Sequence, residues 1–253
     1  MQISLAYFGS SALAPCRSTL TRRRWYLAWT RERCYCGCRE PTDILMKLTI
    51  VDYNGGNLRS VQRACHAVGI DSDFTQDPDA VRIAERLIFP GVGNAQTAME
   101  TLIQLGLDAA LREALARGTP VLGICVGAQL ILESSEESRI PCLGLLPGKT
   151  ERFRLVDPTL KVPHIGWNEV RLTQPHVLLD PLRPGDEFYF VHSYHPNPAD
   201  KSTTYAIADY GGPFCCALGK DNLFATQFHP EKSGRLGLEL LKRFSVWHGS
   251  PTR

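Results

Sequence analysis

The segment GICVGAQ at residues 123–129 holds the residue best suited to covalent chemistry, Cys125. An apolar, β-branched stretch precedes it and an apolar run over residues 129–133 follows it, which predicts a strand, a turn and a helix. Gly123 and Gly127 permit a sharp turn and leave the thiol uncrowded, as in a nucleophile elbow. The first N–H groups of the helix would stabilise negative charge on the sulfur. A structural cysteine in a Gly-rich turn explains the segment equally well.

A second candidate site is QFHPEKS at residues 227–233, where one residue separates His229 from Glu231. In an extended chain both side chains leave on the same face. Glu231 could then orient one ring nitrogen of His229 while the other nitrogen faces a nucleophile. Taken alone, the spacing is more simply explained by a capping or surface pair. Three other histidines, His66, His176 and His248, are expected at the surface.

These residues need elements to position them, and from Met46 onward strand patterns alternate with helix patterns. Strands are predicted at residues 48–51, 72–75 and 86–89, and helices at residues 58–68, 95–105, 107–116 and 235–247, with Asn57 capping the first helix. Repeated βα units predict an α/β fold with a mostly parallel central sheet flanked by helices. The carboxyl ends of such strands share one edge, which places the PGVG turn at residues 90–93 beside Cys125.

After Glu137 the helix pattern gives way to short, often aromatic segments that predict an added antiparallel layer. These segments are residues 152–155, 166–172, 188–191, 205–208, 214–218 and 223–228. No internal repeat or linker interrupts them, so residues 46–253 are expected to form one domain.

Composition fits one ordinary globular domain, because the chain has 253 residues, of which 43% are hydrophobic and 21% charged. The net charge of +2 comes from residues 1–45, which carry seven arginines and three acidic residues, so the remainder is mildly acidic. We therefore expect no nucleic-acid partner. No apolar run approaches the roughly 20 residues of a membrane span, so no membrane partner is expected either.

Residues 1–45 also hold four of the nine cysteines. The CxCxC pattern at residues 34–38 lacks the spacing and the histidine of a zinc site. This Arg-rich stretch has no acidic residue before Glu32 and could be an organelle transit peptide, and residues 12–14 weakly resemble a secretory cleavage site. Neither explanation is convincing, because the residues before that site carry no positive charge and the βα pattern begins abruptly at Met46. We expect an unstructured or non-native extension before Met46. The later cysteines show no paired spacing and are expected to be reduced thiols of a cytoplasmic protein.

Together, GICVGAQ, QFHPEKS and the PGVG turn resemble the motifs of the class I, or triad, glutamine amidotransferases. Within that class, DYNGGN (residues 52–57), PHIGWN (residues 163–168) and FVHSY (residues 190–194) resemble the glutaminase subunits of imidazole glycerol phosphate synthase, which belong to histidine biosynthesis. The resemblance covers residues 46–247 and implies a flavodoxin-like fold. Ala128 departs from the methionine usual in the family, a change that does not touch the chemistry.

The resemblance implies hydrolysis of L-glutamine to glutamate and ammonia through a thioester on Cys125, with His229 as acid and base and Glu231 as its orienting group. It implies backbone donors to the oxyanion at Val92 and Val126, and a peptide flip of the PGVG turn before Val92 can donate. Glutamine contacts are implied for Gln129, Glu137, His192, Ser193 and Tyr194. The chemistry needs no metal and no cofactor.

The resemblance also implies a heterodimer with a separate (β/α)8 cyclase subunit, which receives the ammonia and makes imidazole glycerol phosphate. The residues implied at this interface are Pro163, His164, Ile165, Gly166, Trp167, Asn168, Tyr189 and Lys232. For Trp167 a core position is an alternative, and for Glu137 a solvated helix end is an alternative.

Three other functions stay open. A glutaminase for another acceptor, such as one in pyridoxal phosphate or anthranilate synthesis, would share the triad but not PHIGWN. A free-standing γ-glutamyl hydrolase would be active without a partner. A non-catalytic module of this fold would lack Cys125 or His229, and both are present.

Deleting residues 1–45 should leave the melting temperature and partner binding unchanged, because the βα pattern begins only at Met46. Thermal unfolding of the full chain and the truncated chain tests this. A drop of several degrees in the truncated chain would mean that the segment packs on the domain.

Overall fold

The computed structural model describes residues 47–250, so the expectation for residues 1–45 lies outside the described residues. The helices are α1 (Leu58–Ala67), α2 (Pro78–Ile83), α3 (Ala95–Gln104), α4 (Leu107–Ala116), α5 (Val126–Leu130) and α6 (Gly234–Val246), with 3-10 turns η1 (Lys201–Thr203) and η2 (Pro230–Lys232). None of these helices is long and apolar enough to cross a lipid bilayer.

The strands fall into one large sheet and two small ones. They are β1 (Leu48–Val51), β2 (Ser72–Thr75), β3 (Leu87–Gly91), β4 (Val121–Cys125), β5 (Ser134–Ser135), β6 (Gly148–Arg152), β7 (His164–Glu169), β8 (Arg171–Leu172), β9 (Glu187–His192), β10 (Tyr194–Pro198), β11 (Thr204–Asp209), β12 (Pro213–Lys220) and β13 (Leu223–Thr226).

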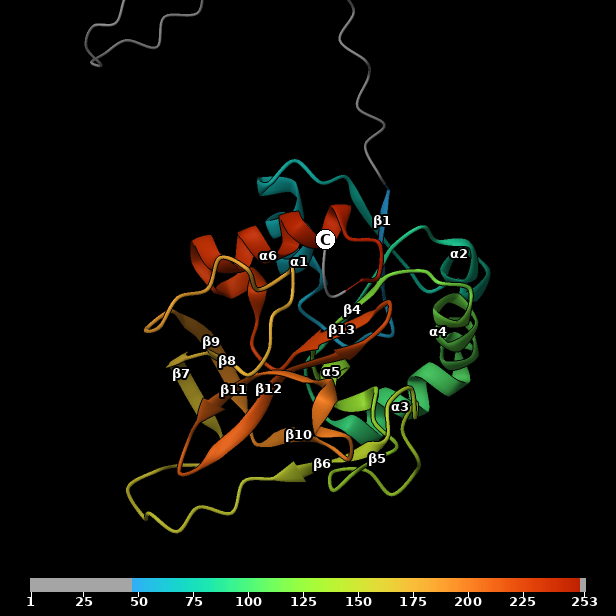
Figure 1. Ribbon diagram of the computed structural model, residues 1–253. Coiled ribbons are helices and arrows are strands. Elements are labelled where there is room, and N and C mark those ends of the chain that lie inside the picture. Colours follow the sequence, from blue (N-terminus) through green and yellow to red (C-terminus); the bar gives the residue numbers. More distant parts are fainter. Residues whose placement is uncertain (1–46, 251–253) are drawn as a thin grey trace, which may run out of the picture. The chain divides into compact units, whose positions relative to one another are not determined.

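The main sheet has the order β2-β1-β3-β4-β13-β12-β11-β8. Its first five strands run parallel and the last three antiparallel, so the predicted α/β architecture with a mostly parallel centre is confirmed. Helices α1 and α6 pack together on one face, and α3 lies with α4 and α5 on the other (Figure 1). β3, β4 and β13 are buried between these layers, which explains their continuous apolar sequences.

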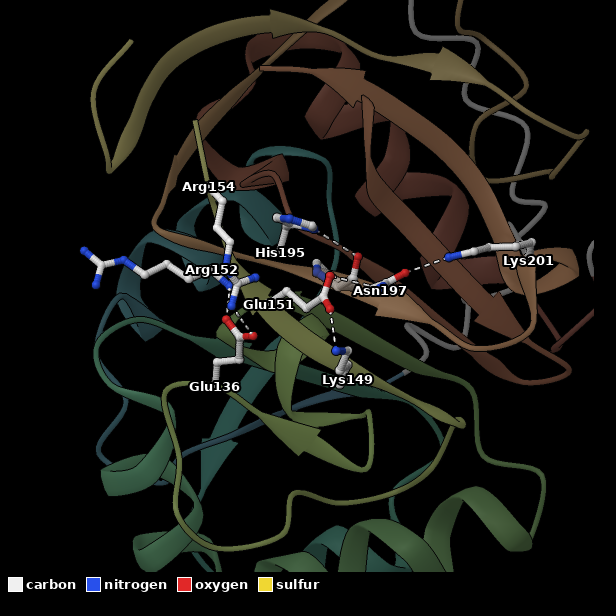
Figure 2. A network of polar contacts seen from close by, with 9 residues as sticks. Glu136, Lys149, Glu151, Arg152, Arg154, His195, Asn197 and Lys201 are labelled. Atoms are coloured by element: carbon white, nitrogen blue, oxygen red, sulfur yellow. Dashed lines mark hydrogen bonds and ion pairs between the residues drawn. The ribbon is translucent and has the colours of Figure 1, made fainter. Parts of the chain in front are cut away.

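The predicted antiparallel layer is in large part a continuation of the main sheet, through β12, β11 and β8. The remaining short strands form the sheets β10-β6-β5 and β7-β9. Side chains on β6 and β10 tie these strands together at the surface, where Glu151 contacts Lys149 at 2.6 Å and accepts from Asn197 at 3.0 Å (Figure 2). β10 begins at Tyr194, so this network fixes a strand that continues directly from the FVHSY motif.

Two local predictions were wrong because tertiary contacts override the sequence pattern. The helix predicted over residues 129–133 begins at Val126 and ends at Leu130, since the carbonyl groups of Leu130 and Ile131 accept from Leu143 and Leu145 at 2.8 and 2.7 Å. The strand predicted at residues 152–155 lies earlier, as β6.

Several elements were missed, and the two longest of them, β10 and α2, contain proline. β10 includes Pro196 and Pro198, which fit because β10 pairs only with β6 and is an edge strand. Helix α2 begins with Pro78 after Asp77, whose side chain accepts from the N–H of Asp79. That start signal was visible in the sequence.

His176 is buried, with 2% of its surface exposed, so its prediction as a surface residue was wrong. Its ring stacks on Phe224 at 4.3 Å and lies 5.5 Å from the ring of Trp247. Burial lowers the pKa of His176 to about 4, so the ring is neutral and packs as an aromatic group.

The Gly127→Ala substitution should destabilise the fold by about 1–3 kcal/mol, because the added methyl group overpacks a buried contact. A Cβ on Gly127 would lie 2.0 Å from the carbonyl oxygen of Phe89 in β3. Denaturant unfolding of the variant and the parent measures the difference. An unchanged midpoint would show that α5 can move away from β3.

Candidate active site

Cys125 is the last residue of β4, and its backbone makes the turn that the motif predicts. Its dihedral angles are φ 56° and ψ −107°, in a region that residues with a Cβ rarely adopt and that stores strain. The following residue already belongs to α5, so the sulfur sits at the start of a helix and at the carboxyl end of a parallel strand. Both predicted features of a nucleophile elbow are present.

His229 and Glu231 form a buried pair, with 1% and 0% of their side-chain surfaces exposed. Nδ1 of His229 lies 2.7 Å from Oε1 of Glu231. The chain is not extended here as predicted, because Pro230 opens the 3-10 turn η2. That tight turn returns the carboxylate to the imidazole, so the pair forms by a different backbone route.

Asn57 is a site residue that the sequence reasoning assigned to another task. Its side chain does not cap α1; its Nδ2 donates to Oε1 of Glu231 at 2.5 Å. Asn57 has a left-handed backbone with φ 62°, which turns the side chain away from the helix N–H groups. No local pattern indicates this contact, because 174 positions separate the two residues.

The charge balance favours a protonated His229. Burial alone lowers its pKa, but the charge and hydrogen bond of Cys125 and those of Glu231 outweigh this effect and raise the pKa to about 10. Nε2 of His229 has no oxygen or nitrogen partner within residues 47–250, and the group beside it is the sulfur of Cys125. At neutral pH the site therefore holds an imidazolium between the sulfur of Cys125 and the carboxylate of Glu231.

The register of the main sheet brings these distant segments together. β13 runs parallel to β4 with Thr226 opposite Ile124, so the chain that follows β13 passes beside Cys125. Gln227, which sequence reasoning overlooked, lies here with its Nε2 3.6 Å from the sulfur. His229 follows two positions later.

A cavity of about 230 Å³ opens over the sulfur. Of the predicted site residues, it is lined by Cys125, His229, Val92, Val126, Gln129, Glu137, His192, Ser193 and Tyr194. Gly93, Pro163 and Val191 complete the wall. Glu137 is half-buried rather than solvated, and its carboxylate accepts from the N–H of Ala95, the first residue of α3, at 2.8 Å.

The two predicted oxyanion donors are arranged differently. The N–H of Val126 opens α5 directly after Cys125. The N–H of Val92 instead donates to the carbonyl of Gly55 at 3.0 Å and is turned away from the cavity. The turn beside it is tight, since a Cβ on Gly91 would lie 2.1 Å from the buried hydroxyl of Tyr53. Gly93, with φ 102°, has open space around it.

His192 meets the cavity with both ring nitrogens already occupied. Nδ1 lies 2.8 Å from the carbonyl oxygen of Tyr194, so Nδ1 carries the proton, and Nε2 lies 3.0 Å from Nδ1 of His164. Burial lowers the pKa of His192 to about 3 and that of His164 to about 4, which keeps both rings neutral. A ligand would therefore meet the backbone of residues 191–194 rather than the His192 ring.

The residues predicted at the interface divide into exposed and buried ones, because successive side chains of β7 point to opposite faces of the strand. Ile165 and Trp167 point outward, with 60% and 53% of their surfaces exposed. The His164 side chain is buried at 3% exposure, and the exposure of Trp167 contradicts the core position given as its alternative. The placement of both residues at an interface stays a prediction. Trp167 on β7 lies opposite Tyr189 on β9, and Nζ of Lys232 lies 5.7 Å from the centre of the Tyr189 ring. We call Ile165, Trp167, Tyr189 and Lys232 the outer face.

Residues 49–246 match the family described as glutamine amidotransferase class-I. The chain is 47% identical over 212 residues to the imidazole glycerol phosphate synthase subunit HisH of Chromobacterium violaceum, a match that covers 81% of this chain and 100% of that protein. It is 48% identical over 208 residues to the same subunit of Dechloromonas aromatica, covering 79% and 96%. A crystal structure of a glutamine amidotransferase is similar with a TM-score of 0.59 over 78% of this chain and 99% of that chain, and its 19% identity supports the fold alone.

Replacing Cys125 with alanine should lower the pKa of His229 by about one unit or more, because the variant loses the largest influence that raises this pKa while burial still opposes the charged ring. NMR titration of ring-labelled histidine measures the change. Cys142→Ala, at another buried cysteine, is the matched control and should leave the titration of His229 as it is. An unchanged titration in Cys125→Ala would mean that the sulfur does not face the imidazole.

Proposed function

The chain belongs to the class I glutamine amidotransferases, and from this we propose that it is the glutaminase subunit of an imidazole glycerol phosphate synthase in histidine biosynthesis. The observation that carries the reaction is that Cys125 and His229 line one cavity and that His229 is paired with the buried carboxylate of Glu231. The names of the relatives, which align along nearly their whole length, support the choice of acceptor reaction.

The reaction begins with attack by the sulfur of Cys125 on the carboxamide carbon of L-glutamine. A C–S bond forms, and the electron pair of the C=O bond moves to the oxygen. The N–H of Val126 is placed to donate to this oxyanion because it is the first amide after the nucleophile. Gln129, Glu137 and the backbone of residues 191–194 hold the rest of the glutamine in the cavity.

His229 carries the proton through the next two steps. The protonated ring gives its Nε2 proton to the departing nitrogen, the C–N bond breaks, and ammonia leaves a γ-glutamyl thioester on Cys125. The neutral ring then takes a proton from water, whose oxygen attacks the thioester and releases glutamate. Glu231, itself held by Asn57, keeps Nδ1 protonated and the ring in position throughout.

The bond from Val92 to Gly55 describes a resting state with only one oxyanion donor. The peptide between Gly91 and Val92 must turn before the Val92 N–H can reach the cavity, and Gly91, which has no side chain, permits the rotation of its own backbone that this movement needs. One oxyanion donor contributes about 3 kcal/mol, or roughly two orders of magnitude in rate. A partner that binds the turned state more tightly would supply this difference.

The cyclase subunit is the partner that we propose, docked on the outer face. Ammonia reacts only as the neutral molecule, so a protected passage to an acceptor enzyme suits a glutaminase. The outer face reaches the triad directly, since the carbonyl of Tyr189 accepts from the N–H of His229 at 3.0 Å and the Tyr189 N–H donates to Ser233 at 3.0 Å. Pro163, just before β7, lines the cavity.

We place this activity in residues 46–253 and in the cytoplasm, with residues 1–45 as an extension that takes no part in it. The cysteines of the described residues support a reducing compartment, because all five are free thiols.

Glutamine turnover by the isolated chain should be low and should rise about a hundredfold when the cyclase subunit with its bound nucleotide saturates it.

Cys125→Ala should abolish glutamine hydrolysis yet leave synthesis from ammonium salts intact, because the acceptor site belongs to the partner. Assays at one glutamine concentration, with and without the partner, measure both effects.

Trp167→Ala should lose the stimulation while it still binds the cyclase subunit. Ile83→Ala is the matched control, since Ile83 is 75% exposed but lies on α2, at the far end of the main sheet (Figure 1). Equal turnover with and without the partner would show that the partner does not activate the glutaminase. It would favour a free-standing γ-glutamyl hydrolase.

A further inference from the structure

Gln227 has a fully buried side-chain amide that has no role in the reaction proposed above. None of its surface is exposed, and its Nε2 lies 3.6 Å from the sulfur of Cys125. Resting on the proposed role of Cys125 as nucleophile, we propose that Gln227 is a positioning residue that donates a hydrogen bond to this sulfur and holds the thiolate in line for attack.

The hydrogen-bond pattern fixes which end of each amide faces its neighbour. The carbonyl oxygen of Tyr194 accepts only, so the atom of Gln129 that lies 3.0 Å from it must be Nε2. Nε2 of Gln129 also lies 3.0 Å from the side chain of Gln227, whose facing atom must then be the acceptor Oε1. Nε2 of Gln227 is thereby turned to the sulfur.

The backbone holds this donor firmly. Gln227 directly follows β13, and its N–H donates to the carbonyl of Cys216 on the neighbouring strand β12 at 2.9 Å. The sulfur therefore has a side-chain donor from the sheet in addition to His229. The two donors differ in their task, since the imidazole gives its proton to the leaving nitrogen whereas the amide keeps its own.

The same arrangement determines what Gln129 offers to the cavity. Both hydrogens of its Nε2 are directed, one to Tyr194 and one to Gln227. Its Oε1 is the group left to face a ligand, so Gln129 presents an acceptor and suits an N–H or ammonium donor of the substrate. Gln227 thus orders both the nucleophile and a residue of the cavity wall.

The test is the pH profile of alkylation of Cys125 by iodoacetamide in the full chain. The tryptic peptide of residues 118–139 carries Cys125 as its single cysteine, so mass spectrometry of this peptide reads the site apart from the other thiols. Gln227→Met keeps the volume and removes the donor. The midpoint of its profile should lie about one pH unit above that of the parent, as expected for the loss of a hydrogen bond to a charged group.

Thr226→Val is the matched control, because Thr226 is equally buried and donates to the carbonyl of Phe228 at 3.0 Å without touching the sulfur. It should lower the melting temperature without moving the midpoint. If Gln227→Met does not fold, Gln227→Leu serves the same purpose. An unchanged midpoint in a folded Gln227 variant, or an equal shift in Thr226→Val, would overturn the proposal. Alkylation requires neither glutamine nor the cyclase subunit, so this result is distinguishable from a failure of the proposed function.

Discussion

The left-handed backbone of Cys125 is the constraint on which the rest of the site depends. A strained residue persists only where its surroundings hold it. Here β4 fixes it on one side, between β3 and β13, and α5 fixes it on the other, pressed against the carbonyl of Phe89. Gly127 is required for that contact because it has no Cβ. The strain and the close packing together place the sulfur at the rim of the sheet, where a substrate can reach it.

Around this fixed point, each polar group of the site takes its orientation from the next. Asn57 holds Glu231, Glu231 holds the His229 ring, and on the other side Tyr194 holds Gln129, which holds Gln227. All of these contacts are buried or nearly so, where an unpaired polar group would be costly and a paired one is well ordered. The site is thus preorganised except at the Val92 amide, which is paired with Gly55 instead.

Val92 lines the same cavity as Pro163, the residue just before β7. The outer face and the triad share backbone hydrogen bonds through Tyr189, and the cavity wall includes Pro163 at the start of β7. A small displacement of β7 and β9 would therefore move both His229 and the wall of the cavity. Coupling of this kind requires no long pathway, because the backbone of Tyr189 in the outer face is hydrogen-bonded directly to the backbone of His229.

The sequence by itself determined the βα order, the elbow at Cys125 and the importance of His229 and Glu231, because local patterns of apolar residues, glycines and proline encode strands, turns and helix starts. It also placed the two chemical motifs at the ends of strands. It could not place Asn57 beside Glu231 or Gln227 beside Cys125, since 174 and 102 positions separate these pairs. Strand register in the main sheet decided those contacts. Tertiary structure also decided that His164 and His176 are buried, because burial depends on which neighbours cover a strand or loop, and no local pattern records that.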